Sequence, residues 1–348
     1  MPQAREGVVM FTDENQGDCL PRSGFRDPGG SEDPFHDSAV LPMFSDKQLE
    51  SAVTELRSML EEDQSVRTQE ALKGEMARKI HSVAQSFPNG HWFQRIDYPS
   101  HHITSTSNHE LAHIDGGGLN TLGNGLSGRE ASILRPWPKW FYLKNLLPDV
   151  AGKSVVEIGS SNGFFCFRFS ERGASRVTGV EIKKGQYESA VWSAEVLGLD
   201  NVSFIHTDFL LDMTIPQYDV VFSSEAHNHF LFPFYGLLRL INLARETVIF
   251  DTGAIDTKDH RLGLESAWDP SNQLLYHSFM LSDGLIMDFL DLIGIPPSRV
   301  KRYKAPPDHS HILYVIDTTD LPQHRIEFSY PDYLTKVMDL RFTPAAED

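Results

Sequence analysis

The stretch Ser154-Val155-Val156-Glu157-Ile158-Gly159-Ser160-Ser161-Asn162-Gly163 decides the fold. Its first half is a short β-branched run, which favours a buried strand, and its two glycines mark a tight turn. The phenylalanine-rich residues that follow predict a helix that ends before Gly173. A strand, a glycine turn and a helix in this order direct backbone N–H groups at a bound ligand. The stretch therefore predicts the first unit of a ligand-binding α/β sheet.

Strands and helices continue to alternate after this unit. The predicted strands span 154–158, 176–181, 202–206, 218–223, 247–251, 299–304 and 311–317, and the predicted helices span 163–172, 187–197, 234–244 and 282–293. Alternation at this spacing is typical of a doubly wound, mostly parallel sheet, because each helix returns the chain to the start of the next strand. We therefore predict an α/β, Rossmann-like fold whose last strand is antiparallel.

The residues before the sheet form an N-terminal extension. The expected divisions are a flexible arm at 1–45, a helical and lid extension at 46–150, the sheet domain at 151–320 and a tail at 321–348. Within the extension, helices are predicted from Asp46, at 68–86 and from Trp137, because apolar residues recur there at helical spacing. The glycine-rich residues 89–128 are predicted to be a lid loop.

Composition and charge limit the functional classes. The 348-residue chain has a formal net charge of −17 and only two cysteines, Cys19 and Cys166. An acidic body repels phosphate backbones, so nucleic acid is disfavoured as a partner. Two cysteines far apart exclude a disulfide scaffold, and no apolar run or leader pattern predicts a membrane span or a signal peptide. We expect a cytoplasmic protein without a membrane partner.

Three acidic residues fall at the ends of successive predicted strands. Glu157 ends the first strand, where a carboxylate suits a cationic amino-acid group and would repel a pyrophosphate. Glu181 ends the second strand and is placed for a ribose diol. Asp208 follows the third strand, where it can accept from an adenine amino group while Phe209 stacks on the ring. The set argues against the dinucleotide of a Rossmann dehydrogenase, which is the alternative interpretation of a glycine turn.

This set resembles the motifs of class I S-adenosylmethionine-dependent methyltransferases over about residues 153–318. The resemblance implies an enzyme that uses S-adenosyl-L-methionine and releases S-adenosyl-L-homocysteine. Ser161 stands where the middle glycine of the usual loop is expected, so the turn must tolerate a side chain. The predicted cofactor-binding residues are Glu157, Gly159, Ser160, Ser161, Asn162, Gly163, Glu181, Ile182, Asp208, Phe209 and Ser224.

The segment after the fourth predicted strand carries the candidate catalytic residues. Ligands bind at the carboxyl ends of parallel strands, and Glu225, His227 and His229 follow directly there. An imidazole with an ordinary pKa of about 6.5 can take a proton from a hydroxyl, an amine or an acidic carbon. We predict that His227 or His229 is the general base. The competing interpretation is that one of them only caps the next helix.

A divalent metal is a second interpretation of the same residues. Glu225, His227 and His229 could join His277, or His309 and His311, around an ion. Fifteen histidines make chance clusters expected, so we predict acid–base chemistry and no metal. The candidate substrate-binding residues are Trp92, Trp137, Asn228, Tyr276 and His277.

Several segments outside the glycine turn resemble the CmoB-like group of methyltransferases. They are His91-Trp92-Phe93-Gln94-Arg95-Ile96, Pro136-Trp137-Pro138-Lys139-Trp140, His227-Asn228-His229 and Tyr276-His277-Ser278-Phe279. The resemblance implies carboxymethylation of the wobble uridine of tRNA with a carboxylated S-adenosylmethionine. In this chain, Asn228 stands in place of the family's tyrosine, and the acidic composition lacks the basic surface that RNA binding requires.

Three functions are compatible with these patterns. The leading hypothesis is methyl transfer to the oxygen, nitrogen or carbon of a small-molecule acceptor, in specialised metabolism. tRNA modification is the second hypothesis. The third is a non-catalytic protein that binds S-adenosylmethionine and assembles into homo-oligomers through its N-terminal extension.

Overall fold

A computed structural model of the chain describes residues 41–42, 46–70, 82, 94–98, 103–104, 130, 134–255, 257–269, 274–304 and 311–321. Most of the predicted arm, the 89–128 loop and the predicted tail lie outside these residues. The helix predicted at 68–86 also lies mostly outside them. Its first three residues, 68–70, belong to the end of α1 (Asp46–Glu70). Among the described helices, none is both long enough and apolar enough to cross a membrane.

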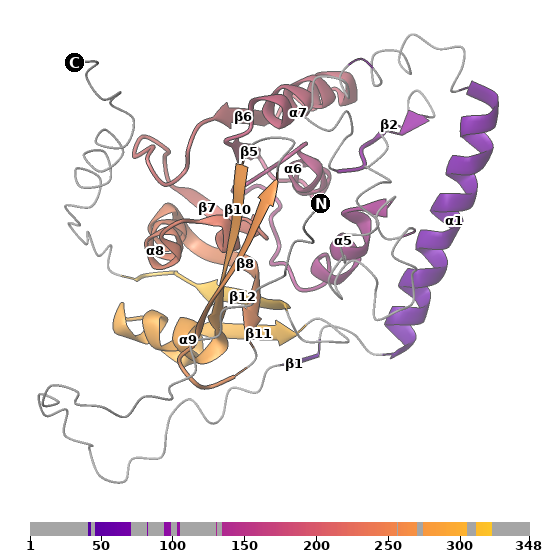
Figure 1. The fold of residues 1–348 in the computed structure, drawn as a ribbon. Helices are drawn as coiled ribbons and strands as arrows, with labels where there is room; N and C mark the ends of the chain where they lie inside the picture. The colour runs from indigo at the N-terminus through magenta and orange to yellow at the C-terminus, as the bar shows by residue number, and fades with distance from the viewer. Residues whose placement is uncertain are drawn as a thin grey trace, which may run out of the picture.

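Most of the described strands form one sheet at the centre of the molecule (Figure 1). The main path of the sheet contains β1 (Leu41–Pro42), β4 (Ser154–Ile158), β5 (Arg176–Glu181), β6 (Val202–His206), β7 (Tyr218–Ser224), β8 (Ala244–Ile255), β11 (Val300–Lys304) and β12 (His311–Asp317). Their order across the sheet is β1-β11-β12-β8-β7-β4-β5-β6. Off this path, β10 (Leu274–Ser282) pairs with β8 and with β9 (Leu262–Asp269). The strands from β8 to β6 run parallel, whereas β12 is antiparallel to both β8 and β11. The predicted doubly wound sheet with one antiparallel strand is confirmed.

Helices cover both faces of this sheet. They are α1, α5 (Trp137–Leu143), α6 (Phe164–Glu171) and α7 (Lys184–Leu197) on one face, and α8 (Pro233–Leu243) and α9 (Asp283–Leu292) on the other. A hydrophobic core lies on each face of the sheet, and successive strand residues point into different cores. Val155 packs in the core on the α6 face, and the next residue, Val156, packs in the core on the α8 face. Strands buried on both faces need continuous apolar runs, and such a run allowed β4 to be predicted from the sequence.

The order of the strands creates a crevice beside β4. The chain passes from β4 outward to β5 and β6, and then returns to β7 on the other side of β4. Connections leave β4 and β7 in opposite directions, so the carboxyl ends of these strands open into a gap where α/β proteins bind ligands. The glycine turn follows β4 directly, and a short 3-10 helix, η4 (His227–His229), follows β7.

Two features differ from the sequence prediction. β8 is longer than predicted, and β9 (Leu262–Asp269) pairs with β10 (Leu274–Ser282) in a hairpin that was not predicted. Leu262 and Leu264 of β9 are more than half exposed, so their apolar side chains do not mark a buried face. A further two-stranded sheet joins β2 (Asp97–Tyr98) to β3 (Ile103–Thr104).

Candidate active site

A cavity of about 460 Å³ lies at the carboxyl ends of β4, β5, β6 and β7. Its size falls in the range of small-molecule sites, and its position matches the switch point of a doubly wound sheet. Seven of the predicted cofactor-binding residues line it, namely Gly159, Ser161, Glu181, Ile182, Asp208, Phe209 and Ser224. Two of the predicted catalytic residues, Glu225 and His229, line the same cavity.

The glycine turn forms one wall of the cavity through an uncommon backbone conformation. Gly159 has a φ of 79°, and a Cβ placed on it would lie 2.5 Å from the Cβ of Ala226. Only glycine fits this position without a shift of the turn after β7. Ser161 has a φ of 51°, which a side chain adopts at some cost. Its N–H donates to Glu181 Oε2 at 2.8 Å, and this bond helps to hold the serine in place of a glycine.

Glu181 is held by the backbone on both of its oxygens. Oε2 accepts from Ser161, and Oε1 accepts from the N–H of Lys183 at 2.7 Å. Burial raises the pKa of Glu181 above its ordinary value, although these hydrogen bonds oppose the rise. The carboxylate is therefore fixed in position at the end of β5, beside the glycine turn.

The Asp208 turn forms the next part of the wall. Asp208 Oδ1 accepts from the N–H of Leu210 at 2.8 Å, which closes the turn on itself. Arg239 on α8 lies beneath it, donates to the carbonyl oxygens of Phe209 and Asp212, and stacks 4.7 Å from the Phe209 ring centroid. The turn thus has its own buried cation as a support.

A segment before the sheet closes the cavity from the other side. The N–H of Gln94 donates to Asn162 Oδ1 at 3.0 Å, and Gln94 Oε1 accepts from the N–H of Phe164 at 3.1 Å. Gln94 therefore satisfies the first turn of α6, where backbone donors lack partners. Asn162 also donates to Ser189 of α7 at 2.7 Å, so it supports the turn from behind and does not line the cavity.

Glu157 lies away from the cavity wall, and its contact with the cofactor stays a prediction. It is buried on the α6 face of β4, and its Oε2 accepts from the thiol of Cys166 at 3.0 Å. Burial raises the pKa of Glu157 to about 8. Among the described residues it does not line the cavity, and neither do Ser160 and Gly163. Strand position alone does not give the side-chain direction that the prediction required.

The two candidate histidines of η4 are in different environments. His227 is buried and lies outside the cavity wall, with Nε2 3.0 Å from the carbonyl oxygen of Pro233 and Nδ1 3.3 Å from Thr252 Oγ1. Burial lowers its pKa to about 4, so it stays neutral near pH 7. His229 is exposed and lines the cavity. The competing interpretation, that one histidine braces the next helix, fits His227.

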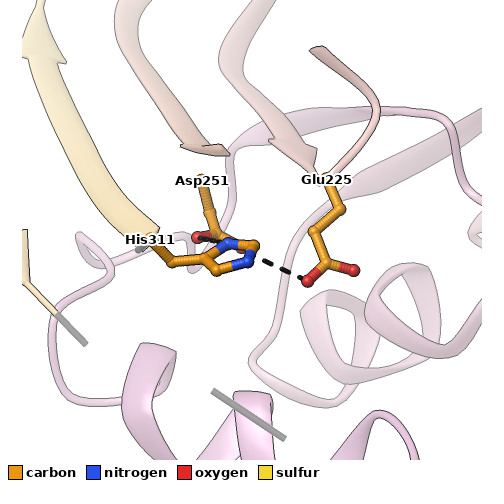
Figure 2. Close-up of side chains that lie close together, drawn as sticks. All are labelled: Glu225, Asp251 and His311. Atoms are coloured by element: carbon orange, nitrogen blue, oxygen red, sulfur yellow. Dashed lines mark ion pairs between the residues drawn. The ribbon is translucent and has the colours of Figure 1, made fainter. Parts of the chain in front are cut away.

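A group of charged side chains lies behind the carboxyl end of β7. Lys139 Nζ is 2.7 Å from Glu225 Oε1 and 2.7 Å from Asp251 Oδ2. Figure 2 shows Glu225, Asp251 and His311 directed toward one another, with His311 Nδ1 3.8 Å from Asp251 Oδ1 and 4.0 Å from Glu225 Oε1. We call these four residues, Lys139, Glu225, Asp251 and His311, the charge cluster.

The neighbours of each member of the charge cluster favour its charged form. Burial would lower the pKa of Lys139, but Asp251 and Glu225 raise it above its ordinary value. Burial would raise the pKa of both carboxyls, but Lys139 and His311 hold them below their ordinary values. The cluster is the arrangement a buried charge needs, because an unpaired charge away from water is costly.

The structure brings together a different set of possible metal ligands from the sets considered in the sequence. Glu225 and His311 do meet, but their third possible ligand is Asp251, and the ligand atoms of these three lie within 4.8 Å of one another. Lys139 already supplies a cation 2.7 Å from both carboxylates. His227 and His229 take no part in this group among the described residues.

Two of the predicted substrate-binding residues, Trp137 and Asn228, are described with their side chains, and neither lines the cavity. Trp137 donates to Asp97 Oδ2 at 2.7 Å, and Asn228 is buried against Thr252. Trp92 and the side chains of Tyr276 and His277 lie outside what the structure describes, although the last two belong to strand β10.

Sequence analysis missed several residues that line the cavity. They are Gln94, Arg135, Lys139, Phe165, Phe230 and Leu231. Lys139 carried a usable signal, since it is a lone cation among aromatic residues in a short apolar helix. Such a residue must be paired when it is buried.

Comparisons with known proteins agree with the site. Residues 149–275 match the family described as methyltransferase domain. The tRNA U34 carboxymethyltransferase of Desulfotalea psychrophila is 29% identical over 123 residues, which are 34% of this chain and 38% of that protein. The enzyme of the same name from Marinobacter nauticus is 28% identical over 151 residues, 38% of this chain and 43% of that protein. The matched stretches thus span about two fifths of each curated relative.

A solved S-adenosylmethionine-dependent methyltransferase from Mesorhizobium loti has 18% identity and a TM-score of 0.38, over 51% of this chain and 97% of that one. The family match at 149–275 spans the glycine turn, Glu181, Asp208 and Glu225, so it bears out the predicted cofactor and enzyme class. The cavity fits such a cofactor, because its walls combine a turn that requires glycine at position 159 with fixed carboxylates. Residues 149–275 are therefore similar to methyltransferase domains, and the cavity that they line is the candidate site for S-adenosylmethionine.

Proposed function

We propose that this protein transfers a methyl group from S-adenosylmethionine to a small-molecule acceptor, in a biosynthetic reaction. The observation that carries the proposal is the composition of one cavity. The same walls contain the glycine turn, Glu181 and Asp208 at one end, and Glu225 and His229 at the other. A cofactor and an acceptor would therefore meet in a single cavity, which aligns the two reactants.

The cofactor end would be occupied as follows. Glu181 would accept hydrogen bonds from the ribose hydroxyls, and Asp208 with Phe209 would hold the adenine. The turn from Gly159 to Ser161 would contact the amino-acid portion. When bound, the cofactor supplies an electrophilic methyl group on a sulfonium. The chain contributes a pocket that is positioned before the ligand arrives, since both Glu181 oxygens are already bonded to backbone.

The acceptor end contains the proposed proton acceptor. His229 is the histidine of η4 that lines the cavity, so we assign it as the general base, and His227 as a structural residue. His229 would take the proton of an acceptor hydroxyl or amine as the bond to carbon forms. Glu225 lies on the same wall, where its carboxylate can orient the acceptor.

The test is release of S-adenosylhomocysteine from S-adenosylmethionine across a panel of small hydroxyl, amine and carbon-acid acceptors. With an active acceptor, His229→Ala should lower turnover about 100-fold or more while the affinity for S-adenosylhomocysteine stays unchanged. His260→Ala is the matched control, because His260 is an exposed histidine on a different surface. Full turnover in His229→Ala would remove this assignment.

tRNA modification is the second candidate, because two relatives are named tRNA U34 carboxymethyltransferases. The net charge of −17 argues against it, since phosphate contacts draw on clustered Lys and Arg. A tRNA gel shift at low salt, together with transfer from a carboxylated S-adenosylmethionine, would replace the small-molecule proposal. No shift and no transfer would leave the small-molecule acceptor as the conclusion.

A further inference from the structure

The charge cluster lies behind the acceptor end of the cavity and joins four distant parts of the chain. Lys139 comes from α5, Glu225 from the turn after β7, Asp251 from β8 and His311 from β12. Only two of the four, Lys139 and Glu225, line the cavity. The other two lie behind them and act through charge.

Exposure decides which charge a ligand meets. The side chain of Glu225 is 39% exposed, whereas those of Lys139 and Asp251 are 3% and 1% exposed. Lys139 and His311 both make their nearest contact to Glu225 through Oε1. The second oxygen, Oε2, makes neither of these contacts. A molecule at this end therefore meets the Glu225 carboxylate more readily than the Lys139 ammonium, which is almost fully buried.

His311 and Asp251 form an incomplete pair. Asp251 Oδ2 is held by Lys139 and by Ser224, but Asp251 Oδ1 and His311 Nδ1 are buried atoms without a hydrogen-bond partner among the described residues. Their separation of 3.8 Å is too long for a hydrogen bond and short enough for an ion pair. If His311 Nδ1 carries a proton, the imidazolium and the Asp251 carboxylate form an ion pair.

We propose that the acceptor end of the cavity binds a protonated amine through the Glu225 carboxylate, and that His311 gives up its proton when the amine binds. The inference rests on the proposed function, because it assigns the chemical class of the acceptor. An amine and the His311 imidazolium are alternative cations for one pair of carboxylates.

The balance of charges gives the sign of this exchange. With His311 neutral, Lys139 offsets only one of the two carboxylates, and the cluster carries a net −1. With His311 protonated the cluster is neutral. The groups that act on His311 are Asp251, Glu225 and Lys139. Burial lowers its pKa, but the two carboxylates more than offset this, so the pKa lies above its ordinary value. Cation binding should therefore strengthen as the pH rises through that pKa.

Two other ligands compete with this interpretation. Glu225, Asp251 and His311 have the donor types and spacing for a divalent ion, but an ion there would have to displace the Lys139 ammonium. Arg135 also lines the cavity, and could favour an anionic ligand. Both ligands predict results that differ from those of an amine.

The probes are S-adenosylhomocysteine and sinefungin, the cofactor analogue in which a primary amine replaces the sulfonium methyl. Their affinities for the full chain are measured by calorimetry from about pH 6 to about pH 8.5. We expect the preference for sinefungin over S-adenosylhomocysteine to increase about tenfold across this range. Sinefungin binding should also release a proton, seen as heats that depend on the ionisation enthalpy of the buffer.

Variants separate His311 from the titration of the probe itself. His311→Gln should keep the high preference at every pH, and His311→Lys should keep the low one. Glu225→Gln should abolish the preference. His260→Gln, a histidine substitution away from the cavity, should behave as the parent. S-adenosylhomocysteine binding reports that each variant is folded.

The outcomes are distinguishable. If S-adenosylhomocysteine does not bind the parent chain, the proposed function fails. If it binds, but the preference for sinefungin is independent of pH or falls as the pH rises, the proposed function stands and the amine site is wrong. A preference that changes on addition of EDTA, or of Zn²⁺, would assign the cluster to a metal and overturn the amine site.

Discussion

The two ends of the cavity are built by different means. The cofactor end consists of turns at the ends of neighbouring strands, and its carboxylates are held by backbone N–H groups within about twenty residues, as in the bond from Ser161 to Glu181. The acceptor end consists of charged side chains brought together by the tertiary fold. Lys139 and Asp251, which pair at 2.7 Å, are 112 residues apart in sequence.

This difference separates two kinds of sensitivity. The cofactor end depends on backbone conformation, so substitutions that demand a new φ should damage it most. The acceptor end depends on charge balance in a buried setting, so loss of one partner should leave a second charge unpaired. Substitutions that change φ should therefore affect mainly the cofactor end, and substitutions that remove a charge should affect mainly the acceptor end.

Lys139→Met should have the largest effect on stability. It removes the cation that lies 2.7 Å from two carboxylates, one of them fully buried. Breaking such a pair by removing one partner costs about 3–5 kcal/mol in the free energy of unfolding, measured by urea denaturation. Lys184→Met is the control, because Lys184 is 75% exposed and its partner Glu188 is 3.7 Å away. An equal, small effect of both substitutions would show that the acceptor end does not depend on buried charge.

The burial of His227, behind the acceptor end, can be tested through the pH dependence of the free energy of unfolding. Its pKa is about 4 in the folded protein, below the ordinary value of 6.5. The unfolded chain therefore binds more protons between these values, and the parent loses stability as the pH falls from about 6.5 to about 4. The shift corresponds to about 3 kcal/mol, and His227→Gln should lose that part of the slope in urea titrations. His229→Gln, at the exposed histidine, should keep it.

Gly159→Ala tests the cofactor end. The new Cβ would lie 2.5 Å from the Cβ of Ala226, in a backbone conformation that side chains rarely adopt. We expect a loss of about 1–3 kcal/mol in stability and a loss of S-adenosylhomocysteine binding measured by calorimetry. Gly198→Ala is matched, because Gly198 also has a positive φ but a Cβ there meets nothing within 4 Å. That variant should keep its ligand affinity and bear only the conformational cost.

The same difference explains what the sequence could predict. β4, β5, β6 and β12 were placed at their observed bounds, because each is a short run rich in apolar and β-branched residues. Seven of the predicted cofactor-binding residues line the cavity, since strand ends and turns are local features that a sequence shows. The charge cluster was not, because Asp251 and His311 become neighbours only through the pairing of β8 with β12. The sequence also did not show which of His227 and His229 lines the cavity, since a 3-10 turn directs residues two apart to different surroundings.

Glu157 and Glu181 offer the finest test, because both were predicted from one motif to bind the cofactor. Glu181 lines the cavity, and Glu181→Gln should weaken S-adenosylhomocysteine binding about tenfold, since it removes a charged acceptor. Glu157 faces Cys166 instead, and Glu157→Gln should change that affinity less than about threefold. Its pKa of about 8 means that the buried carboxyl is mostly neutral near pH 7, as an amide is. The parent should accordingly lose stability relative to Glu157→Gln as the pH rises from about 4.5 to about 8, because over this window the unfolded chain gives up the carboxyl proton while the folded state keeps it. A tenfold loss of affinity in Glu157→Gln would place this carboxyl in contact with the cofactor and extend the cofactor end to the α6 side of β4.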